Sequence, residues 1–224
     1  MNFENQLELG LGIYTPTEIA RILRIPSRKV HWWIKRYWDG ELGKRYEARY
    51  SWKTNNSKAV SFHKLIEFYV MMELSEQGVK TRPLLEAHKI LSDRYKSPFP
   101  FAKKEVLQNI RTDGKRIYFV VDEASILALD GSGQLNLSFI EVFFKNIDLD
   151  TENLAFRYWP LGRCNSILID PERKFGHPVI ANRNIAPEII YNHIKSGDPV
   201  NYIAHVYNLT EKQVDDALEY CNAA

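Results

Sequence analysis

Cysteine is scarce in this sequence, with 2 residues in a chain of 224. Cys164 and Cys221 lie far apart, and neither belongs to a group of Cys and His residues with the spacing of a zinc site. Two isolated cysteines also supply no disulfide framework. We expect both to be small buried apolar side chains, and we expect neither a metal nor a cofactor.

Long apolar runs and export signals are also absent. No stretch approaches the roughly 20 apolar residues that cross a bilayer, and residues 1–10 lack the basic and apolar pattern of a signal peptide. We therefore expect a cytoplasmic protein that does not contact membranes.

Catalytic motifs are missing too. Asp122 and Glu123 are adjacent carboxylates, but neighbouring side chains on a strand point to opposite faces, so they make a poor acid–base pair. Gly131-Ser132-Gly133 is too short to hold a phosphate and is typical of a turn. Because no nucleotide loop or nucleophile elbow occurs, we expect a binding protein that is not an enzyme.

Positive charge is concentrated near the N-terminus, although the formal net charge of the whole chain is only +2. Residues 21–58 contain 11 Lys or Arg and 3 Asp or Glu, which gives a local charge of +8 and leaves −6 for the remainder. Such a concentration is the electrostatic pattern of phosphate binding. The alternative is a basic surface that is merely solvated.

Residues 14–38 predict two helices joined by a tight turn. Thr15 and Glu18 have the spacing of a capping box, with Pro16 at the first helical position. Pro26 disfavours helical geometry in the residue before it, and Ser27 is placed to cap the second helix. Helical spacing directs these side chains of the second helix to the core: Val30, Trp33, Ile34 and Tyr37.

The outer face of the second helix is basic and suits a DNA groove. A hairpin is predicted over residues 49–62, around a turn at residues 54–57, and it would touch phosphates or a minor groove like a wing. An ordinary surface hairpin is the alternative, and Trp32 could instead pack against that hairpin. The predicted DNA contacts are Ser27, Arg28, Lys29, His31, Trp32, Lys35, Arg36, Lys53, Asn55, Asn56 and Lys58.

Two further helices are predicted over residues 61–78 and 83–95, with His88 at the edge of the core rather than in a ligand set. The segments YTPTEIARILRIPSRKVHWWIK and VSFHKLIEFYVMMELSEQGVKTRPLLEAHKIL resemble the winged helix-turn-helix of MerR-type regulators. The resemblance implies that Arg28, Lys29, His31 and Trp32 meet DNA. Unlike that family, the chain has no long heptad helix for a dimerisation coiled coil and no cysteine cluster for a metal sensor.

Residues 98–165 predict a small mixed or antiparallel sheet. A short helix is expected over residues 103–109, strands are expected over 116–121 and 154–159, and residues 139–147 suit either a strand or a helix.

Residues 166–224 predict two short strands followed by three helices. Pro187, Pro199 and the Thr210/Gln213 pair mark the three helix starts. The predicted core of this module is Ile189, Ile190, Ile194, Ile203, Val206, Tyr207, Val214, Ala217, Leu218 and Cys221. The last helix is acidic, so DNA phosphates would repel it, and we expect it to bind protein.

The segment IDPERKFGHPVIANRNIAPEIIYNHIKSGDPVNYIAHVYNLTEKQVDDALEY resembles a bacterial domain of unknown function that is common among antitoxins. Together with the MerR-like start, the chain resembles the longer VapB-type antitoxins. That resemblance implies a cognate toxin with a PIN-like ribonuclease fold as partner. It also implies repression of the protein's own operon through double-stranded operator DNA bound by a homodimer. The alternative is a stand-alone MerR-like regulator whose middle region senses a ligand through residues such as Tyr158 and Trp159.

The predicted fold is thus α+β and predominantly α-helical. Its predicted domains are a winged helix-turn-helix (1–97), a small β-containing bridging region (98–165) and a three-helix, helix-turn-helix-like module (166–224).

Overall fold

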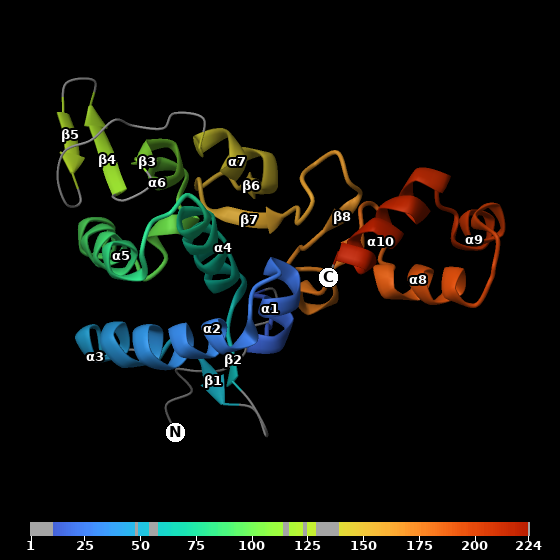
Figure 1. Ribbon diagram of the computed structural model, residues 1–224, viewed down its shortest axis with the longest axis horizontal. Helices are drawn as coiled ribbons and strands as arrows, with labels where there is room; N and C mark the ends of the chain where they lie inside the picture. Colours follow the sequence, from blue (N-terminus) through green and yellow to red (C-terminus); the bar gives the residue numbers. More distant parts are fainter. Residues whose placement is uncertain are drawn as a thin grey trace.

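The computed structural model describes residues 11–47, 49–53, 58–113, 117–122, 125–128 and 139–223. Within these ranges the helices are α1 (Pro16–Leu23), α2 (Ser27–Trp32), η1 (Trp33–Leu42), α3 (Gly43–Arg45), α4 (Phe62–Glu76), α5 (Thr81–Tyr95), η2 (Pro100–Ala102), α6 (Lys104–Asn109), α7 (Phe139–Asn146), η3 (Lys174–Gly176), α8 (Pro187–Lys195), α9 (Val200–Tyr207) and α10 (Glu211–Ala223). The strands are β1 (Trp52–Lys53), β2 (Lys58–Ala59), β3 (Ile110–Thr112), β4 (Ile117–Asp122), β5 (Ser125–Ala128), β6 (Ile147–Leu149), β7 (Ala155–Tyr158), β8 (Ile167–Leu168) and β9 (Val179–Ile180). Figure 1 shows α8 to α10 together at one end of the molecule and β3 to β5 at the other.

The strands form small antiparallel sheets. In the described ranges β1 pairs with β2, β4 lies between β3 and β5, β6 pairs with β7, and β8 pairs with β9. This confirms the predicted α+β class and selects the antiparallel alternative for the middle region. The expected turn at residues 131–133 lies outside the described residues.

The second predicted helix is longer than the sequence indicated. It was expected to end near Trp38, but α2, η1 and α3 follow one another without interruption to Arg45. The segment η1 is a π-helix, whose hydrogen bonds join residues five apart. Its buried side chains include Trp33, Trp38 and Leu42. Because these residues are five and four positions apart, the wider turns keep them on one face.

The helix starts depend on residues close in sequence. Thr15 and Glu18 cap each other at α1 as predicted, with 2.7 Å from Thr15 N to Glu18 Oε2. Thr210 N likewise donates to Gln213 Oε1 at 3.0 Å before α10. Ser27, however, is the first residue of α2, and the N-cap is Pro26, so the predicted Ser27 cap is wrong. Without a side-chain oxygen, Pro26 offers no cap hydrogen bond.

The main hydrophobic core extends over buried residues from Tyr14 to Ile169. Helix α4 runs through its middle, and even the polar side chains Lys64 and Glu67 are buried there. Tyr158, suggested as a ligand-sensing residue, is buried in this core, with its ring 4.8 Å from that of Tyr69. Trp159 donates from Nε1 to Asp148 Oδ2 at 2.9 Å. Tyr158 therefore serves in packing, and a hydrogen bond ties the Trp159 side chain to β6.

A second, smaller core joins β8 and β9 to the three C-terminal helices. Ile190, Ile203, Val214 and Ala217 are buried there as predicted. Two predicted core positions are wrong, since Ile189 is 40% and Val206 51% exposed. Each of these short helices buries only a narrow face against its neighbours. An apolar side chain that lies beside this face therefore remains exposed. The predicted domain boundaries at 97/98 and 165/166 stay predictions.

The cysteines also differ from expectation. Cys164 is exposed and Cys221 is partly exposed. Cys164 lies in the loop that precedes β8, and the core does not cover this loop. No group of three or more metal-ligating residues occurs in the described part of the chain.

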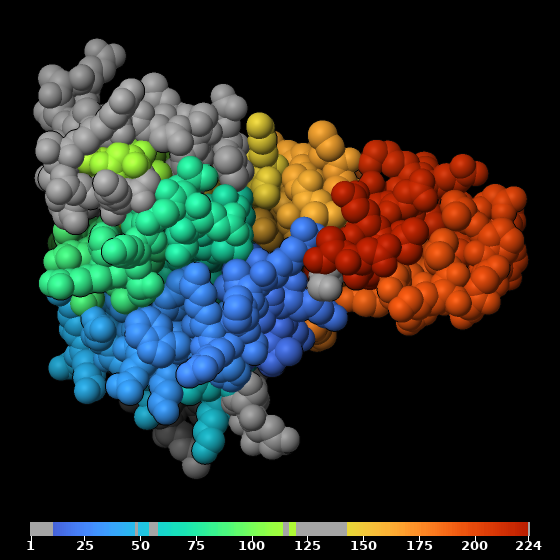
Figure 2. Space-filling model, viewed as in Figure 1, coloured from blue at the N-terminus to red at the C-terminus, as the bar shows by residue number. Residues whose placement is uncertain are grey.

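The C-terminal helices contact the N-terminal helices directly. Figure 2 shows the red surface of α10 against the blue surface of the N-terminal helices. The Arg21 guanidinium on α1 pairs with Glu188 of α8 at 3.3 Å, and Ile13 N donates to Phe175 O at 2.9 Å. Gly176 lies so close to Tyr14 that an added Cβ would stand 2.0 Å from the Tyr14 hydroxyl oxygen.

Candidate nucleic-acid interface

The candidate site is the outer surface of α2 and η1, where most of the predicted DNA contacts lie. Ser27, Arg28, His31, Lys35 and Arg36 are exposed there. In the described part of the chain no carboxylate forms an ion pair with Arg28, Lys35 or Arg36. Their charges are therefore open to solvent and to a polyanion.

Lys29 differs from its neighbours because it is partly buried. Its ammonium lies 4.8 Å from the centroid of the Trp33 ring, which itself stacks on Phe68 at 5.5 Å with an interplanar angle of 7°. This cation–π contact holds the Lys29 side chain against the helix. The same side chain can thus present a charge in a fixed position.

Trp32 lies on the outer side of the second helix, as predicted. Its side chain is 47% exposed and lines a groove of about 520 Å³ with Leu85, Glu86 and Lys89 of α5 and with Glu41 of η1. The Lys89 ammonium pairs with the Glu41 carboxylate beside it. Trp32 thus lies beside α5, and both its predicted contact with DNA and the alternative of packing against the hairpin stay predictions.

The hairpin forms as predicted, with Trp52 opposite Ala59 and Lys53 opposite Lys58. Lys53 is exposed, whereas Lys58 donates to Asp39 Oδ2 at 2.5 Å. Asn55 and Asn56 lie outside the described residues. Lys53 and Lys58 lie directly opposite each other, and like charges in such a pair repel. The Asp39 carboxylate reduces this repulsion because it pairs with Lys58.

Asp39 was not predicted as a functional residue. It connects the hairpin to the long helix, which consists of α2, η1 and α3. Its carboxylate also accepts hydrogen bonds from Tyr50 N at 3.3 Å and from Ser51 Oγ at 2.5 Å. Because Asp39 belongs to η1, these contacts fix the position of β1 relative to the basic helix face. In the sequence, the signal for this role was a carboxylate within a strongly basic stretch.

A buried polar network holds the other side of the long helix. Tyr37 Oη lies 2.6 Å from His88 Nδ1 and 3.2 Å from Leu85 O, while His88 Nε2 lies 2.9 Å from Glu67 Oε2. Ala102 N donates to Glu67 Oε1 at 3.1 Å. The network joins η1, α5, α4 and η2, so His88 lies in the core rather than at its edge.

Burial makes this network electrically neutral. Desolvation raises the pKa of Glu67 well above its usual value and, with a smaller effect of Lys89, lowers the pKa of His88 to about 3. One proton assignment satisfies every group: Glu67 donates to His88 Nε2, His88 Nδ1 donates to Tyr37, and Tyr37 donates to the carbonyl of Leu85. Periodicity alone could not have revealed these partners, because they are distant in sequence.

The C-terminal module and the chain as a whole are each similar to known proteins. Over residues 167–221 the chain matches a family described as "Protein of unknown function (DUF433)", in agreement with the resemblance predicted for the C-terminal module. It is similar to the crystal structure of Rv2018 from Mycobacterium tuberculosis, with a TM-score of 0.69, 16% identity, and coverage of 95% of this chain and 99% of that chain. This likeness shows a shared fold.

In sequence, the chain is 23% identical to "Putative antitoxin VapB45" of Mycobacterium tuberculosis (strain ATCC 25618 / H37Rv) over 236 residues. The alignment covers 96% of each protein. The chain thus resembles an antitoxin over nearly its whole length. Separately, none of its described helices is both long enough and apolar enough to traverse a bilayer.

Proposed function

We propose that this protein is the antitoxin of a toxin–antitoxin pair and represses its own operon. In this proposal the basic face of α2 and η1 binds double-stranded operator DNA, and a homodimer places two such faces on the operator. The protein acts in the cytoplasm by binding, without catalysis of its own. The similarity to a VapB antitoxin across 96% of both chains is the observation that carries the proposal.

DNA binding is supported by the charge of the helix face. Arg28, Lys35 and Arg36 are exposed and have no carboxylate partner among the described residues. Each phosphate that such a group neutralises releases a counterion, which makes binding strongly dependent on salt. Lys53 on the hairpin extends the same charge toward a second set of phosphates, as a wing of a helix-turn-helix would do.

Toxin binding is assigned to the C-terminal module. Glu211, Asp215 and Glu219 are exposed on α10, whereas the Lys212 ammonium bonds Asp216 at 2.8 Å and is thereby neutralised. The outer surface of this helix is therefore acidic. The proposed partner is a PIN-like ribonuclease, whose RNA-binding face must be basic, and opposite charges across the interface would favour their association.

The first experiment compares two variants of the full chain. Arg28→Ala with Lys35→Ala should weaken binding to the protein's own promoter DNA and reduce the salt slope by about 2. Lys195→Ala, an exposed lysine on α8, is the control. Fluorescence anisotropy over a range of salt concentrations measures both quantities, and an unchanged slope would refute the assignment of this face.

The second experiment tests the toxin. Glu211→Gln with Asp215→Lys should abolish rescue when the protein is co-expressed with the product of the neighbouring gene, and it should leave operator binding intact. The DNA-face variant should behave in the opposite way. If the neighbouring gene does not encode a small toxin that arrests growth, the antitoxin assignment is wrong.

A further inference from the structure

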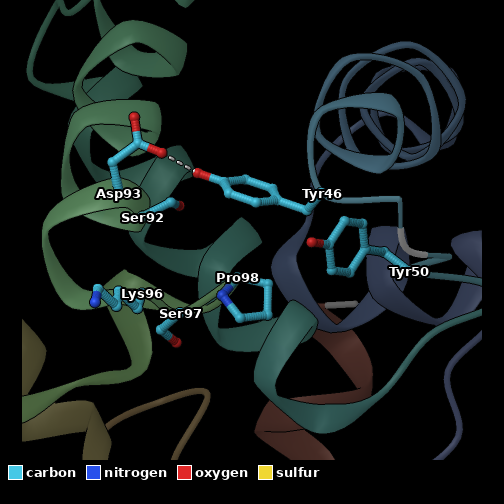
Figure 3. Close-up of a pocket in the computed structure, with 7 residues that line it drawn as sticks. All are labelled: Tyr46, Tyr50, Ser92, Asp93, Lys96, Ser97 and Pro98. Atoms are coloured by element: carbon cyan, nitrogen blue, oxygen red, sulfur yellow. Dashed lines mark hydrogen bonds between the residues drawn. The ribbon is translucent and has the colours of Figure 1, made fainter.

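A cavity of about 560 Å³ lies where the end of the long helix meets the end of α5 (Figure 3). Tyr46 and Tyr50 line one side, Ser92 and Asp93 of α5 line another, and residues 96–98 line the third. Figure 3 shows the two phenol rings on the same side of this space, with the ring of Pro98 below them. The volume is within the range of small-molecule sites, which combine apolar walls with a few polar groups.

The aromatic walls are accessible to a ligand. Tyr46 is 37% exposed, and Tyr50 is partly exposed. Tyr46 is held in place because its hydroxyl donates to the carboxylate of Asp93. Two positioned rings beside a proline offer stacking surface for a planar group.

The charges around the cavity are positive in excess. Asp93 is neutralised by the guanidinium of Arg45, which belongs to α3. Lys96 is exposed and forms no ion pair within the described ranges. Behind Tyr50, the buried Lys64 ammonium lies 4.9 Å from the centroid of the Tyr50 ring and also faces Trp38 and Phe99 at 5.7 and 5.9 Å.

Lys64 is a further basic group beside the cavity. It makes no ion pair in the part of the chain that the structure describes, and desolvation lowers its pKa to about 7. A nearby anion would favour its charged form. The cavity therefore suits a negative ligand better than a positive one.

We propose that this cavity binds a small aromatic anion, with its ring against Tyr46 and Tyr50 and its acidic group toward Lys96 and Ser97. The site is separate from the basic face of α2 and η1 and from the acidic face of α10. It is also separate from Tyr158 and Trp159, which the sequence suggested for ligand sensing.

Occupation of the cavity would reach the DNA face through Tyr50. The backbone N–H of Tyr50 donates to Asp39 of η1, and its ring meets Trp38 edge-on at 5.7 Å. Ser51, the next residue, donates to the same carboxylate and precedes β1. A ligand that displaces Tyr50 therefore loosens the connection between the hairpin and the long helix. This consequence rests on the proposed DNA-binding function, whereas the binding site itself does not.

The test uses three compounds of similar shape and different charge: phenylacetate, phenylacetamide and phenethylamine. Isothermal titration calorimetry on the full chain, without DNA, should show phenylacetate binding most tightly. Lys96→Asn should weaken the affinity for phenylacetate by only about fivefold, because Lys96 is exposed and solvent screens its charge. The affinity for phenylacetamide should not change. Asparagine tolerates the left-handed backbone of Lys96, whose φ is 45°.

Lys174→Asn is the matched control, since Lys174 is also an exposed lysine with a left-handed backbone, at φ 44°. It should leave the affinity for phenylacetate unchanged. Tightest binding of phenethylamine, equal binding of all three compounds, equal losses in the two lysine variants, or no binding at millimolar concentration would each overturn the site.

DNA affinity provides the second measurement. Phenylacetate at saturation should weaken promoter binding of the wild type about fivefold, a coupling of ordinary size, and Lys96→Asn should shift this effect to higher ligand concentration. Ligand binding with unchanged DNA affinity would overturn the coupling through Tyr50. A protein that binds phenylacetate but no promoter DNA would refute the proposed function and leave the cavity assignment standing.

Discussion

The N-terminal helices and the C-terminal module each contain a trio of tyrosine, histidine and carboxylate. In the N-terminal helices His88 lies 2.6 Å from the Tyr37 hydroxyl and 2.9 Å from Glu67, and all three side chains are fully buried. In the module His193 lies 2.8 Å from the Tyr207 hydroxyl and 2.6 Å from Asp198, and its side chain is 35% exposed.

The two trios differ in the distance along the chain that they connect. Tyr37 and His88 are 51 residues apart, and they join η1 to α5, whereas His193 and Asp198 are 5 residues apart and close the turn between α8 and α9. The buried trio thus determines where the long helix lies. The exposed trio only reinforces a local turn, because water can replace any of its hydrogen bonds.

The largest expected effect is that of removing the buried histidine. His88→Ala leaves Glu67 and Tyr37 without partners and opens a cavity, and it should lower the free energy of unfolding by about 4 kcal/mol. His193→Ala should cost only about 1 kcal/mol, since solvent reaches its partners. Urea denaturation measures both, and equal losses would show that the two trios are equivalent after all.

The contact between the two regions is tested at glycine. Gly176→Ala places a Cβ 2.0 Å from the Tyr14 hydroxyl oxygen at φ +87°, and it should cost about 3 kcal/mol. Gly197→Ala is the control, because its φ is +91° but no atom lies within 4 Å of an added Cβ. It should cost about 1 kcal/mol, the conformational term alone. Comparable melting temperatures for the two variants would mean that the contact is not tight.

A third prediction concerns the pH dependence of stability that the buried trio causes. Folded His88 remains neutral below pH 6.5, its unfolded pKa, so stability is lost as the pH falls from 6.5 toward about 3. Folded Glu67 remains protonated above 4.5, its unfolded pKa, so stability is lost as the pH rises above 4.5 until the raised pKa is reached. Between pH 4.5 and 6.5 the two effects have opposite signs.

Glu67→Gln preserves the hydrogen bonds of the network and removes one of the two titrations. As the pH rises above 4.5, the raised pKa of Glu67 lowers wild-type stability, by at most about 1.4 kcal/mol per pH unit, and this loss should disappear in the variant. Denaturation at a series of pH values provides the measurement. A variant with the same alkaline slope as the wild type would assign that slope to other groups.

The smallest effect is expected where the two regions use the same local device. Thr15→Ala at α1 and Thr210→Ala at α10 each remove one capping box and should cost about 1 kcal/mol. Chemical denaturation of both variants tests this expectation. A much larger loss at Thr15 would mean that the N-terminal cap supports the contact with the module, where Glu18 lies 3.7 Å from His177.

Much of the local structure could be predicted from the sequence. The capping boxes, the break at Pro26, the buried face of Val30, Trp33, Ile34 and Tyr37, and the hairpin strands follow from residues that are neighbours in the chain. Within the candidate site, the exposure of Arg28, His31, Lys35 and Arg36 followed from the same helical spacing.

The rest could not be predicted because it depends on contacts between distant residues. The continuation of the helix from Trp38 to Arg45 places Tyr46 against Asp93 and Arg45 beside it, a contact across 47 or 48 residues. The groove beside Trp32 and the ion pair between Lys58 and Asp39 likewise require a second element to be in position.

The sequence by itself determined the helices, their starts and the concentration of positive charge, because hydrogen bonding and periodicity act over a few residues. Only the tertiary structure decided which polar groups are buried. Glu67, His88 and Lys64 have side chains that the sequence would place at a surface, and burial among partners from four separate elements gives them neutral or weakened charge.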